Sequence, residues 1–485
     1  MNRTMRAIIP IAVAAIVWML PVPDGLTVNA MRYLGIFLAV ILGLILEPLP
    51  NSAVGMIGVV LCGTLMLVPA AGGKAPTAGQ SLGWTLSGFV DGTVWLIFVA
   101  YMFAMGYEKT GLGKRIALLL MKSLGGKALG LGFATAIADL VLAPFIPSNT
   151  ARSAGTVYPV VKNIPPMYGS LPENEPRKIG AYLMWICIAT TSVTSSMFFT
   201  GLAPNLLALG LIAKAPGAEG LAPIEWMDWF WCMLPAGVVL FLLVPILTYI
   251  IYPPTQKDFG ETPKWAAREL EKLGAITRKE LLMILMATIA LVLWIFGKRI
   301  FVGFSNATLV ALIVLCLMVI TDVISWDDVV ANKSAWNTLV WFATLVAMAS
   351  GLARVGFLSW LTQQCAAQLQ GYSVMGVMFG LLCLWYFAHY FFASLTAHTT
   401  ALMPVLLAAG AAVQGMDVRL LGMMFAGCLG IMGILTPYGT GPSPVYYNTG
   451  YIEKKTFWIF GSVYGFVFFA VYAIGALYWF PVILK

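Results

Sequence analysis

Four short polar stretches interrupt long apolar runs in this sequence, and their residue types could bind an anion. The first, "PSNTAR" (147–152), combines a Ser-Asn-Thr triplet with an arginine, and another, "TAHTT" (396–400), contains a histidine. Together the stretches offer hydroxyls, amide groups, backbone N–H groups and two cationic candidates, but no carboxylate. Such groups suit a small polyanion whose carboxylates accept many hydrogen bonds. The candidate binding residues are Ser148, Asn149, Thr150, Gly201, Pro204, Asn205, Ala397, His398, Thr399, Thr440, Gly441, Pro442 and Ser443, with Arg152 and His398 as charge-compensating groups.

Each of these features also has a purely structural explanation. Ser and Thr in membrane helices commonly bond their own backbone, Gly-Pro interruptions can be kinks, and Arg152 could extend toward the cytoplasm. Asp139 is either a buried partner of Arg152 or a separate polar contact, whereas the aromatic neighbours of His389 favour a structural role. An intramembrane enzyme would need a positioned base or nucleophile with suitable neighbours. Only Asp139 and two histidines are available, so we expect no enzymatic activity.

The composition places these stretches in a membrane. Of 485 residues, 60% are hydrophobic and 10% are charged, whereas soluble domains carry about 25% charged residues. Apolar runs such as 281–297 and 457–475 approach the ~18–20 residues that cross a bilayer as a helix. We therefore expect an all-α polytopic membrane protein, with 7–22 as a retained helix rather than a signal peptide. The seven scattered cysteines are expected to be small core residues.

About eleven transmembrane helices and two re-entrant hairpins account for the apolar runs. Polar residues break 128–161 and 373–409 near their middles, so these segments are expected to be the hairpins. Eleven crossings put the termini on opposite faces. With a cytoplasmic N-terminus, 19 of the 28 Lys and Arg residues fall inside and eight outside, as the positive-inside rule requires. The net charge of +8 therefore indicates orientation rather than nucleic-acid binding. The spans are expected at 7–22, 30–48, 51–70, 91–107, 178–213, 227–253, 279–297, 304–322, 335–351, 419–449 and 456–483.

The two halves of the chain resemble each other. The stretch 94–116 is similar to 339–361, and each is followed by an amphipathic helix, a broken hairpin and an interrupted span. The Gly-x-x-Pro core that begins at Gly201 matches the one that begins at Gly439. An odd number of crossings separates the repeats, so they are inverted. Paired interrupted segments in inverted halves indicate a transporter site near the bilayer midplane and argue against a passive anion channel.

Two charged segments are expected to contain amphipathic helices. The stretch 257–280 is the most charged of the chain and is expected to be a cytoplasmic linker with an amphipathic helix on the membrane surface. The stretch 111–126 has the same character. A solvated connecting helix is an equal alternative for both.

The motifs resemble those of the divalent anion/sodium symporter family of di- and tricarboxylate transporters. The similarity covers nearly the whole chain and is greatest to the bacterial citrate, tartrate and succinate exchangers, through "PSNTAR", "SAWNTL", "LTAHTTALMP" and "ILTPYGTGPSPVYY". It implies a homodimeric elevator in which a transport domain carries both hairpins past a scaffold domain. The resemblance implies substrate-carboxylate binding by Ser148, Asn149, Thr150, Thr399, Thr440 and Gly441.

One departure from the family pattern concerns sodium. Sodium-coupled members resemble one another in having a second Ser-Asn-Thr, which is Ala397-His398-Thr399 in this chain. The change removes hard oxygen ligands of the kind that a small cation prefers. Arg152 and His398 are therefore interpreted as stand-ins for bound sodium, which would leave the empty site with uncompensated positive charge. We expect no cofactor and no requirement for sodium.

These observations lead to one functional hypothesis and one alternative. The chain is expected to exchange di- or tricarboxylates, such as succinate, malate, tartrate, citrate or 2-oxoglutarate, across a bacterial inner membrane by an elevator mechanism. The alternative is a sodium-coupled dicarboxylate symporter. The expected parts are 1–107 (scaffold), 108–253 (transport domain), 254–356 (linker and scaffold) and 357–485 (transport domain), with the N-terminus cytoplasmic and the C-terminus outside.

Overall fold

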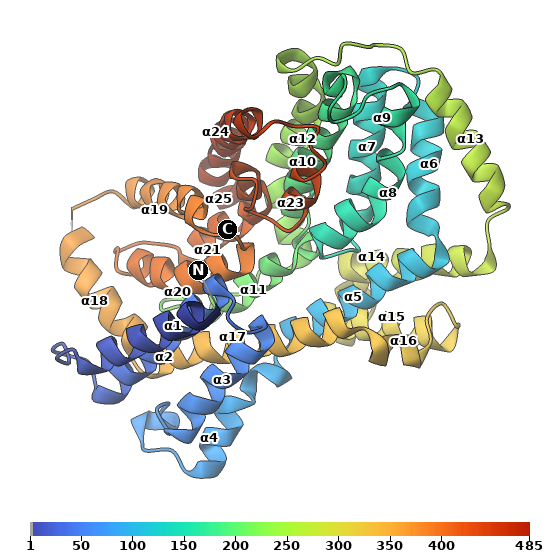
Figure 1. The fold of residues 1–485 in the computed structure, drawn as a ribbon. Coiled ribbons are helices and arrows are strands. Elements are labelled where there is room, and N and C mark those ends of the chain that lie inside the picture. The colour runs from blue at the N-terminus through green and yellow to red at the C-terminus, as the bar shows by residue number, and fades with distance from the viewer. Residues whose placement is uncertain (1–2, 370) are drawn as a thin grey trace. The chain divides into compact units, whose positions relative to one another are not determined.

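The computed structural model describes residues 3–369 and 371–485, and every regular element in these ranges is a helix (Figure 1). The predicted all-α class is therefore confirmed. The chain divides into two compact units. Unit 1 comprises Met1–Phe98, Leu206–Ile224 and Lys333–Ala426, and unit 2 comprises Val99–Asn205, Glu225–Asn332 and Gly427–Lys485. These units reflect contacts in one conformation, whereas scaffold and transport domains are defined by movement, so the latter division stays a prediction.

Six helical segments in the described ranges are long and apolar enough to cross a membrane. A seventh results if two helices bent by 43°, Val418–Gly427 and Leu429–Leu435, are counted as one span. Several shorter apolar helices of 10–17 residues accompany them. Every predicted span coincides with helical structure, but several are short or broken, so the count of eleven crossings stays a prediction. The six long segments are α2 (Val28–Leu46), α12 (Trp226–Ile251), α14 (Arg278–Ile300), α17 (Lys333–Arg354), Val374–Phe391 and Lys454–Ile483.

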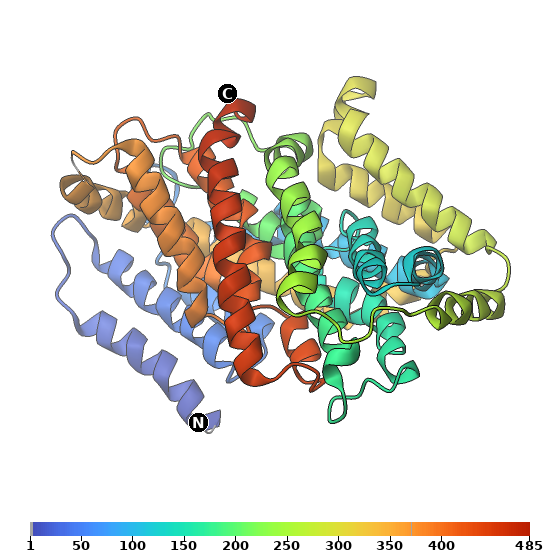
Figure 2. The ribbon, with the colours of Figure 1, turned by 90° about the horizontal axis from the view of Figure 1, so that it is seen from above.

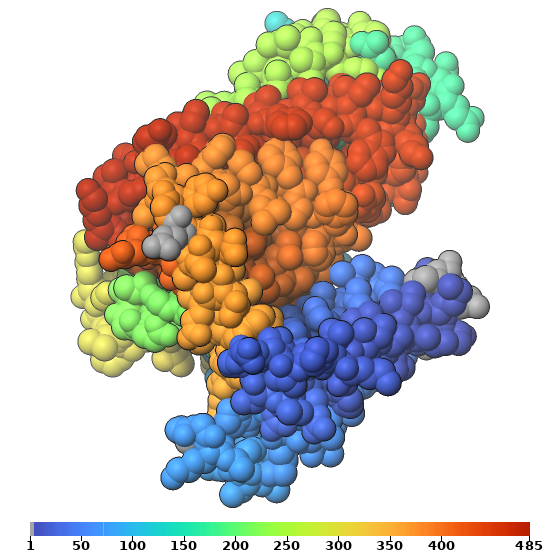
Figure 3. Space-filling view, turned by 90° about the vertical axis from the view of Figure 1, so that its left-hand side faces the viewer, coloured from blue at the N-terminus to red at the C-terminus, as the bar shows by residue number. Residues whose placement is uncertain are grey.

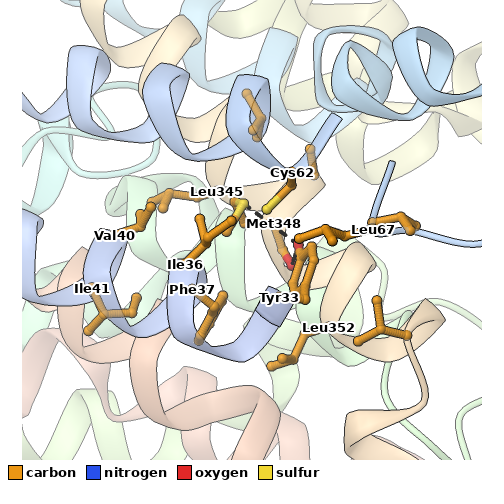
Figure 4. Close-up of a cluster of buried hydrophobic side chains, with 14 of the residues drawn as sticks. Tyr33, Ile36, Phe37, Val40, Ile41, Cys62, Leu67, Leu345, Met348 and Leu352 are labelled. Carbon is orange, nitrogen blue, oxygen red and sulfur yellow. Dashed lines mark hydrogen bonds between the residues drawn. The ribbon is translucent and has the colours of Figure 1, made fainter. Parts of the chain in front are cut away.

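The core of unit 1 lies where α2, α3 (Asn51–Thr64) and α17 pack together (Figure 4). Tyr33 on α2 is fully buried there, and its hydroxyl donates to the carbonyl of Met348 on α17 over 2.6 Å. Glycines allow the close approach, since a Cβ at Gly58 would lie 2.4 Å from Val40. This helix α3 ends at Thr64, short of the predicted 51–70, because Met66 takes a left-handed φ of 52°.

Helix α1 (Arg3–Met19) covers one face of unit 1 and is seen in dark blue in Figure 3. Its exposed side chains include Ile8, Ile11 and Ile16. Large apolar side chains on the surface are expected for a helix that faces lipid rather than water. The predicted first span therefore has the character of a membrane helix.

Unit 2 is built around α10 (Gly180–Met197), every residue of which is buried. It packs against α12 and α7 (Ala128–Leu142), while α12 and α24 (Lys454–Tyr478) lie side by side (Figure 2). An entirely buried helix that carries a Thr- and Ser-rich stretch needs internal partners for its hydroxyls. Those partners are described below with the site.

The charged linker is bonded to the base of the first hairpin. It contains α13 (Glu261–Leu273), which packs on α6 (Leu112–Leu124), the second predicted amphipathic helix. The backbone N–H of Ala128 donates to the carbonyl of Lys257 over 3.0 Å, and that of Phe259 donates to Gly126 over 2.9 Å. An ion pair between Arg115 Nε and Glu280 Oε1, 2.5 Å apart, joins α6 to the start of α14.

Both predicted hairpins are pairs of helical arms around a break. In the first, α7 is followed by residues 143–149 and then by a π-helical segment, η3 (Thr150–Val157), that continues into α8 (Tyr158–Val161) (Figure 1). In the second, η7 (His389–Phe391) and residues 392–394 separate α19 (Val374–Ala388) from α20 (Leu395–Ala411). The π-helical second arm was not predicted, and π-helical turns are frequent at functional sites.

The two Gly-Pro interruptions are also present. The first lies at η5 (Phe199–Gly201), between α10 and α11 (Ala203–Ile212), and the second leads from η8 (Gly433–Leu435) into α23 (Pro442–Tyr447). Non-helical backbone within a membrane protein is tolerated where it is buried or lines a cavity. The first hairpin and both interruptions meet in unit 2, and the second hairpin belongs to unit 1.

Candidate functional site

Three of the four predicted polar stretches meet within unit 2. The backbone N–H of Ala203 donates to the carbonyl of Pro147 over 2.7 Å, which joins the first interruption to the hairpin tip. The Thr200 hydroxyl donates to the carbonyl of Pro144 over the same distance. These bonds hold Gly201, Pro204 and Asn205 beside the Ser-Asn-Thr triplet.

The second interruption reaches the same tip. Asn149 Nδ2 donates to Thr440 Oγ1 over 2.6 Å, and both side chains are buried. A Cβ at Gly441 would lie only 2.0 Å from Thr150 Oγ1, so a glycine is required for this approach. The hydroxyl of Ser148 accepts from the N–H of Ala151 over 3.2 Å and stabilises the start of the second arm.

Pro442 and Ser443 begin α23 directly after this contact. Pro442 occupies the first turn of the helix, where its missing N–H costs nothing. Ser443 Oγ is buried without a hydrogen-bond partner. A buried hydroxyl of this kind is available to a ligand.

Arg152 is completely buried, and each of its nitrogens has hydrogen-bond acceptors. The predicted alternative, in which Arg152 extends toward the cytoplasm, is therefore wrong. The acceptors come from the hairpin, from the first interruption and from the hydroxyls of α10. They are Asp139 Oδ1 at 2.9 Å from Nε, the carbonyls of Ile146 and Gly201 at 2.7 Å from Nη1, and the hydroxyls of Ser195, Thr191 and Thr194 at 2.8, 3.3 and 3.4 Å from Nη2.

Asp139 is the buried ion-pair partner of Arg152, which settles the choice left open by the sequence. Asp139 Oδ1 also accepts from the Thr194 hydroxyl. Because the carboxylate balances the guanidinium, the expectation that Arg152 leaves the empty site with uncompensated positive charge is wrong. A buried ion is tolerated when its partners are charged and hydrogen-bonded.

The acceptors around Arg152 form an oxygen cage of the kind that binds a hard cation. It consists of a carboxylate oxygen, two carbonyl oxygens and hydroxyl oxygens. Small hard cations prefer such ligands. In this structure the guanidinium of Arg152 fills the cage and bonds these oxygens.

The second hairpin presents its own candidate residues within unit 1. The Ser394 hydroxyl accepts from the N–H of Ala397 over 3.3 Å and caps α20. The Thr399 hydroxyl donates to the carbonyl of Leu395 over 2.8 Å. This is a bond to the backbone of its own helix, as expected if the residue has a purely structural role. Thr399 must rotate before its hydroxyl can donate to a ligand.

His398 lies in a box of aromatic rings. Its ring centroid is 4.2 Å from Trp385, 4.9 Å from Phe392 and 5.2 Å from His389. The side chain is fully buried, and neither ring nitrogen has a hydrogen-bond partner among the residues that the structure describes. Both ring nitrogens are therefore available to bond a ligand.

The sequence analysis missed the contribution of α10. Thr191, Thr194 and Ser195 all bond the guanidinium of Arg152, yet none was proposed as a site residue. The signal was present in the run "ATTSVTSS" (189–196), which is unusually rich in hydroxyls for a buried helix. It also missed the bond of 2.7 Å between Ser153 Oγ and the Tyr446 hydroxyl, which ties the second arm to α23.

This combination of hairpin, interruptions and matched halves agrees with what the comparisons find. The family model of the sodium:sulfate symporter transmembrane region matches residues 1–485. The chain belongs to this family. Its members are transporters, so the chain is a multi-pass membrane transporter and not an enzyme.

Curated relatives give the same classification, and solved structures share the fold. The chain is 44% identical to the L-tartrate/succinate antiporters of Escherichia coli K12 and Shigella flexneri, over 99% of this chain and 98% of each relative. The resemblance to the tartrate and succinate exchanger branch is thereby confirmed. The fold is similar to that of the Alcanivorax borkumensis YdaH transporter, with a TM-score of 0.57, 14% identity and coverage of 89% of this chain and 97% of that chain. Neisseria gonorrhoeae MtrF, described among antimetabolite efflux pumps, has the same TM-score and identity, with 89% and 94% coverage.

Proposed function

We propose that this transporter exchanges di- or tricarboxylates across the bacterial inner membrane without sodium. The candidate substrates are succinate, malate, tartrate, citrate and 2-oxoglutarate. The 44% identity to proteins named L-tartrate/succinate antiporters supports the choice of substrate class. The excess of Lys and Arg in one set of loops supports a cytoplasmic N-terminus and an external C-terminus.

The observation that carries the proposal is the guanidinium of Arg152 in its oxygen cage. A sodium ion that entered this position would have to displace a side chain that is fully buried and paired with Asp139. Removing one partner of such a pair is costly because it leaves the other charge buried. The cage therefore already holds a cationic side chain that is part of the protein. We expect that it does not bind a sodium ion from solution.

In this proposal the substrate carboxylates bind where Asn149 meets Thr440. Carboxylate oxygens only accept hydrogen bonds, whereas the amide and the hydroxyl can both donate. The bond that now joins them would be exchanged for two bonds to the ligand. Ser148, Thr150 and the backbone at Gly441 border this position, and Ser443 supplies an unused hydroxyl.

Transport requires that part of the protein moves across the membrane. The transport domain (108–253 and 357–485) would carry both hairpins past a scaffold (1–107 and 254–356) in a homodimer. Ala397, His398 and Thr399 are the candidate binding residues of the second hairpin. His398 supports this role because its ring nitrogens are unused. Because Asp139 balances the charge of Arg152, that charge does not account for strict coupling of exchange.

Transport into proteoliposomes tests the proposal. Vesicles loaded with unlabelled succinate should accumulate labelled succinate rapidly, whether the external cation is sodium or potassium. Vesicles without internal dicarboxylate should accumulate little. Rapid uptake into empty vesicles that depends on an inward sodium gradient would instead support the alternative, a sodium-coupled dicarboxylate symporter, to which the family description points.

A further inference from the structure

Asn205 has a side-chain amide whose orientation is fixed by the end of α10. Its Nδ2 donates to the carbonyl of Ser195 over 2.8 Å and to that of Phe198 over 3.2 Å. Both N–H groups of the amide are therefore used. A flipped amide would place its oxygen against two carbonyl oxygens, so this orientation is the only one that avoids repulsion.

The oxygen of the same amide is left without a partner. Asn205 is fully buried, and Oδ1 makes no hydrogen bond in the described structure. An unpaired buried acceptor is unfavourable relative to a paired one, because its desolvation is not compensated. A buried acceptor normally accepts a hydrogen bond, so its donor is expected to be either a ligand or a buried water.

The position of Asn205 favours a ligand. Asn205 lies two residues after Ala203, whose N–H is bonded to Pro147 next to the Ser-Asn-Thr tip. The residue therefore belongs to the interruption that is bonded to this tip, and the inference rests on the proposed function, in which the substrate carboxylates bind at the tip.

Only a hydrogen-bond donor of the substrate could pair with Asn205 Oδ1. Ionised carboxylates and keto groups only accept hydrogen bonds, so they cannot satisfy an acceptor. A substrate hydroxyl can donate. Within unit 2, the described side-chain acceptors that are buried, unable to donate and unpartnered are Asn205 Oδ1 and Asp139 Oδ2. The negative charge of Asp139 would repel an adjacent substrate carboxylate, whereas the neutral amide of Asn205 would not.

We propose that Asn205 Oδ1 accepts a hydrogen bond from a substrate hydroxyl, so that the carrier prefers 2-hydroxydicarboxylates to their deoxy analogues. Malate and tartrate carry such a hydroxyl and succinate does not. A site built around a hydroxyl discriminates against the analogue that lacks it, because the protein acceptor then stays unpaired. Asn205 is thus a specificity-determining residue within the candidate site.

Competition binding with purified protein tests this role. Wild-type protein should bind malate about tenfold more tightly than succinate, as expected for one hydrogen bond at a buried acceptor. In Asn205→Ala the preference should disappear, so that malate and succinate bind with about the same affinity. Thr135→Val is the control, since it removes a buried hydroxyl bond of unit 2 outside the candidate site without changing an unpaired acceptor, and it should keep the tenfold preference.

The outcomes separate this inference from the proposed function. If wild-type protein binds succinate and malate equally, or if Asn205→Ala keeps the preference, Oδ1 is paired with water and the inference is wrong while exchange stands. If wild-type protein binds no dicarboxylate, both the proposed function and the inference fail. If Asn205→Ala does not fold, Asn205→Ser, which keeps a small polar side chain, is measured in the same way and must also reduce the preference.

Discussion

The side chains of Arg152 and Asp139 form an ion pair that is withdrawn from solvent, with Nε and Oδ1 2.9 Å apart and exposed fractions of 0% and 3%. The pair joins the π-helical arm of the first hairpin to its α-helical arm, α7. Because the other guanidinium nitrogens bond α10 and Gly201, the pair also holds the hairpin against the first interruption.

Removing either charge should destabilise the protein strongly. Asp139→Asn and Arg152→Met each leave one buried charge without its partner, at a cost of about 3–5 kcal/mol. The double variant Asp139→Leu/Arg152→Met buries no charge and should be more stable than either single variant. Unfolding temperatures of the detergent-purified proteins measure this, and a wild-type value for Asp139→Asn would contradict the pairing.

A shorter side chain at position 152 should create a sodium response. Arg152→Ala leaves a cage of carboxylate, carbonyl and hydroxyl oxygens, which suits a small hard cation. Sodium should raise the unfolding temperature of Arg152→Ala and have little effect on wild type. Arg152→Lys keeps a cation in the cage and serves as the control. A sodium response of equal size in all three proteins would show that the cage is not involved.

A methyl group at position 441 should separate the second interruption from the hairpin tip. The added carbon would lie 2.0 Å from Thr150 Oγ1, and overpacking of this kind typically costs about 1–3 kcal/mol. Gly441→Ala should lose stability, and Thr150→Ala in the same protein should restore part of it. Gly83→Ala is the control, because nothing lies within 4 Å of the added carbon there.

The Ser-Asn-Thr triplet of the first hairpin and the Ala397-His398-Thr399 triplet of the second should respond differently to alanine substitution. Asn149→Ala removes an amide that already points at Thr440, so transport should be nearly abolished while the protein stays folded. A hydrogen bond to a charged ligand is worth about 1.5–3 kcal/mol. Thr399→Ala should cost less at the binding step, because its hydroxyl first has to leave Leu395. Equal substrate affinity in wild type and Asn149→Ala would remove Asn149 from the site.

The ion pair between Lys109 and Asp328 should give a pH-dependent contribution to stability. Lys109 Nζ lies 2.5 Å from Asp328 Oδ1, and this bond, together with the N–H of Ser325, lowers the pKa of Asp328 to about 2 from its ordinary 3.8. The contribution is therefore present above about pH 4 and is lost as the pH falls through about 2. The difference in unfolding temperature between wild type and Asp328→Asn should be constant from pH 5 to 7 and shrink in stronger acid. Asp327→Asn, at an exposed neighbouring position, should show no such trend.

Much of this fold follows from local patterns in the sequence. Long apolar runs, Gly-Pro pairs and the break in each hairpin predict where helices begin and end, because these depend on neighbouring residues. The tip residues Ser148, Asn149 and Thr150 and the two interruptions were predicted for the same reason, and the structure brings them together in unit 2.

What the sequence could not provide is the partner of each polar group. Asp139 and Arg152 are 13 residues apart on two arms, and only the angle between the arms decides whether they meet. The bonds from the hydroxyls of α10 are even harder to predict, because the hydroxyls of a Thr-rich helix can bond either the helix's own carbonyls or another segment. The charge of the empty site depends on these pairings, which is why the electrostatic argument from the sequence alone was wrong.

The backbone bonds at the base of the first hairpin place a mechanical limit on any motion of that hairpin. Ala128 is bonded to Lys257 and Phe259 to Gly126, so the start of the linker and the start of α7 form one rigid piece. If the hairpin travels as an elevator car, residues 257–259 must travel with it, although the predicted boundary puts them on the stationary side. The joint that absorbs the displacement then lies beyond Phe259 in the chain. The segment at Gly274, with a φ of 70° directly after α13, has the backbone freedom that such a joint needs.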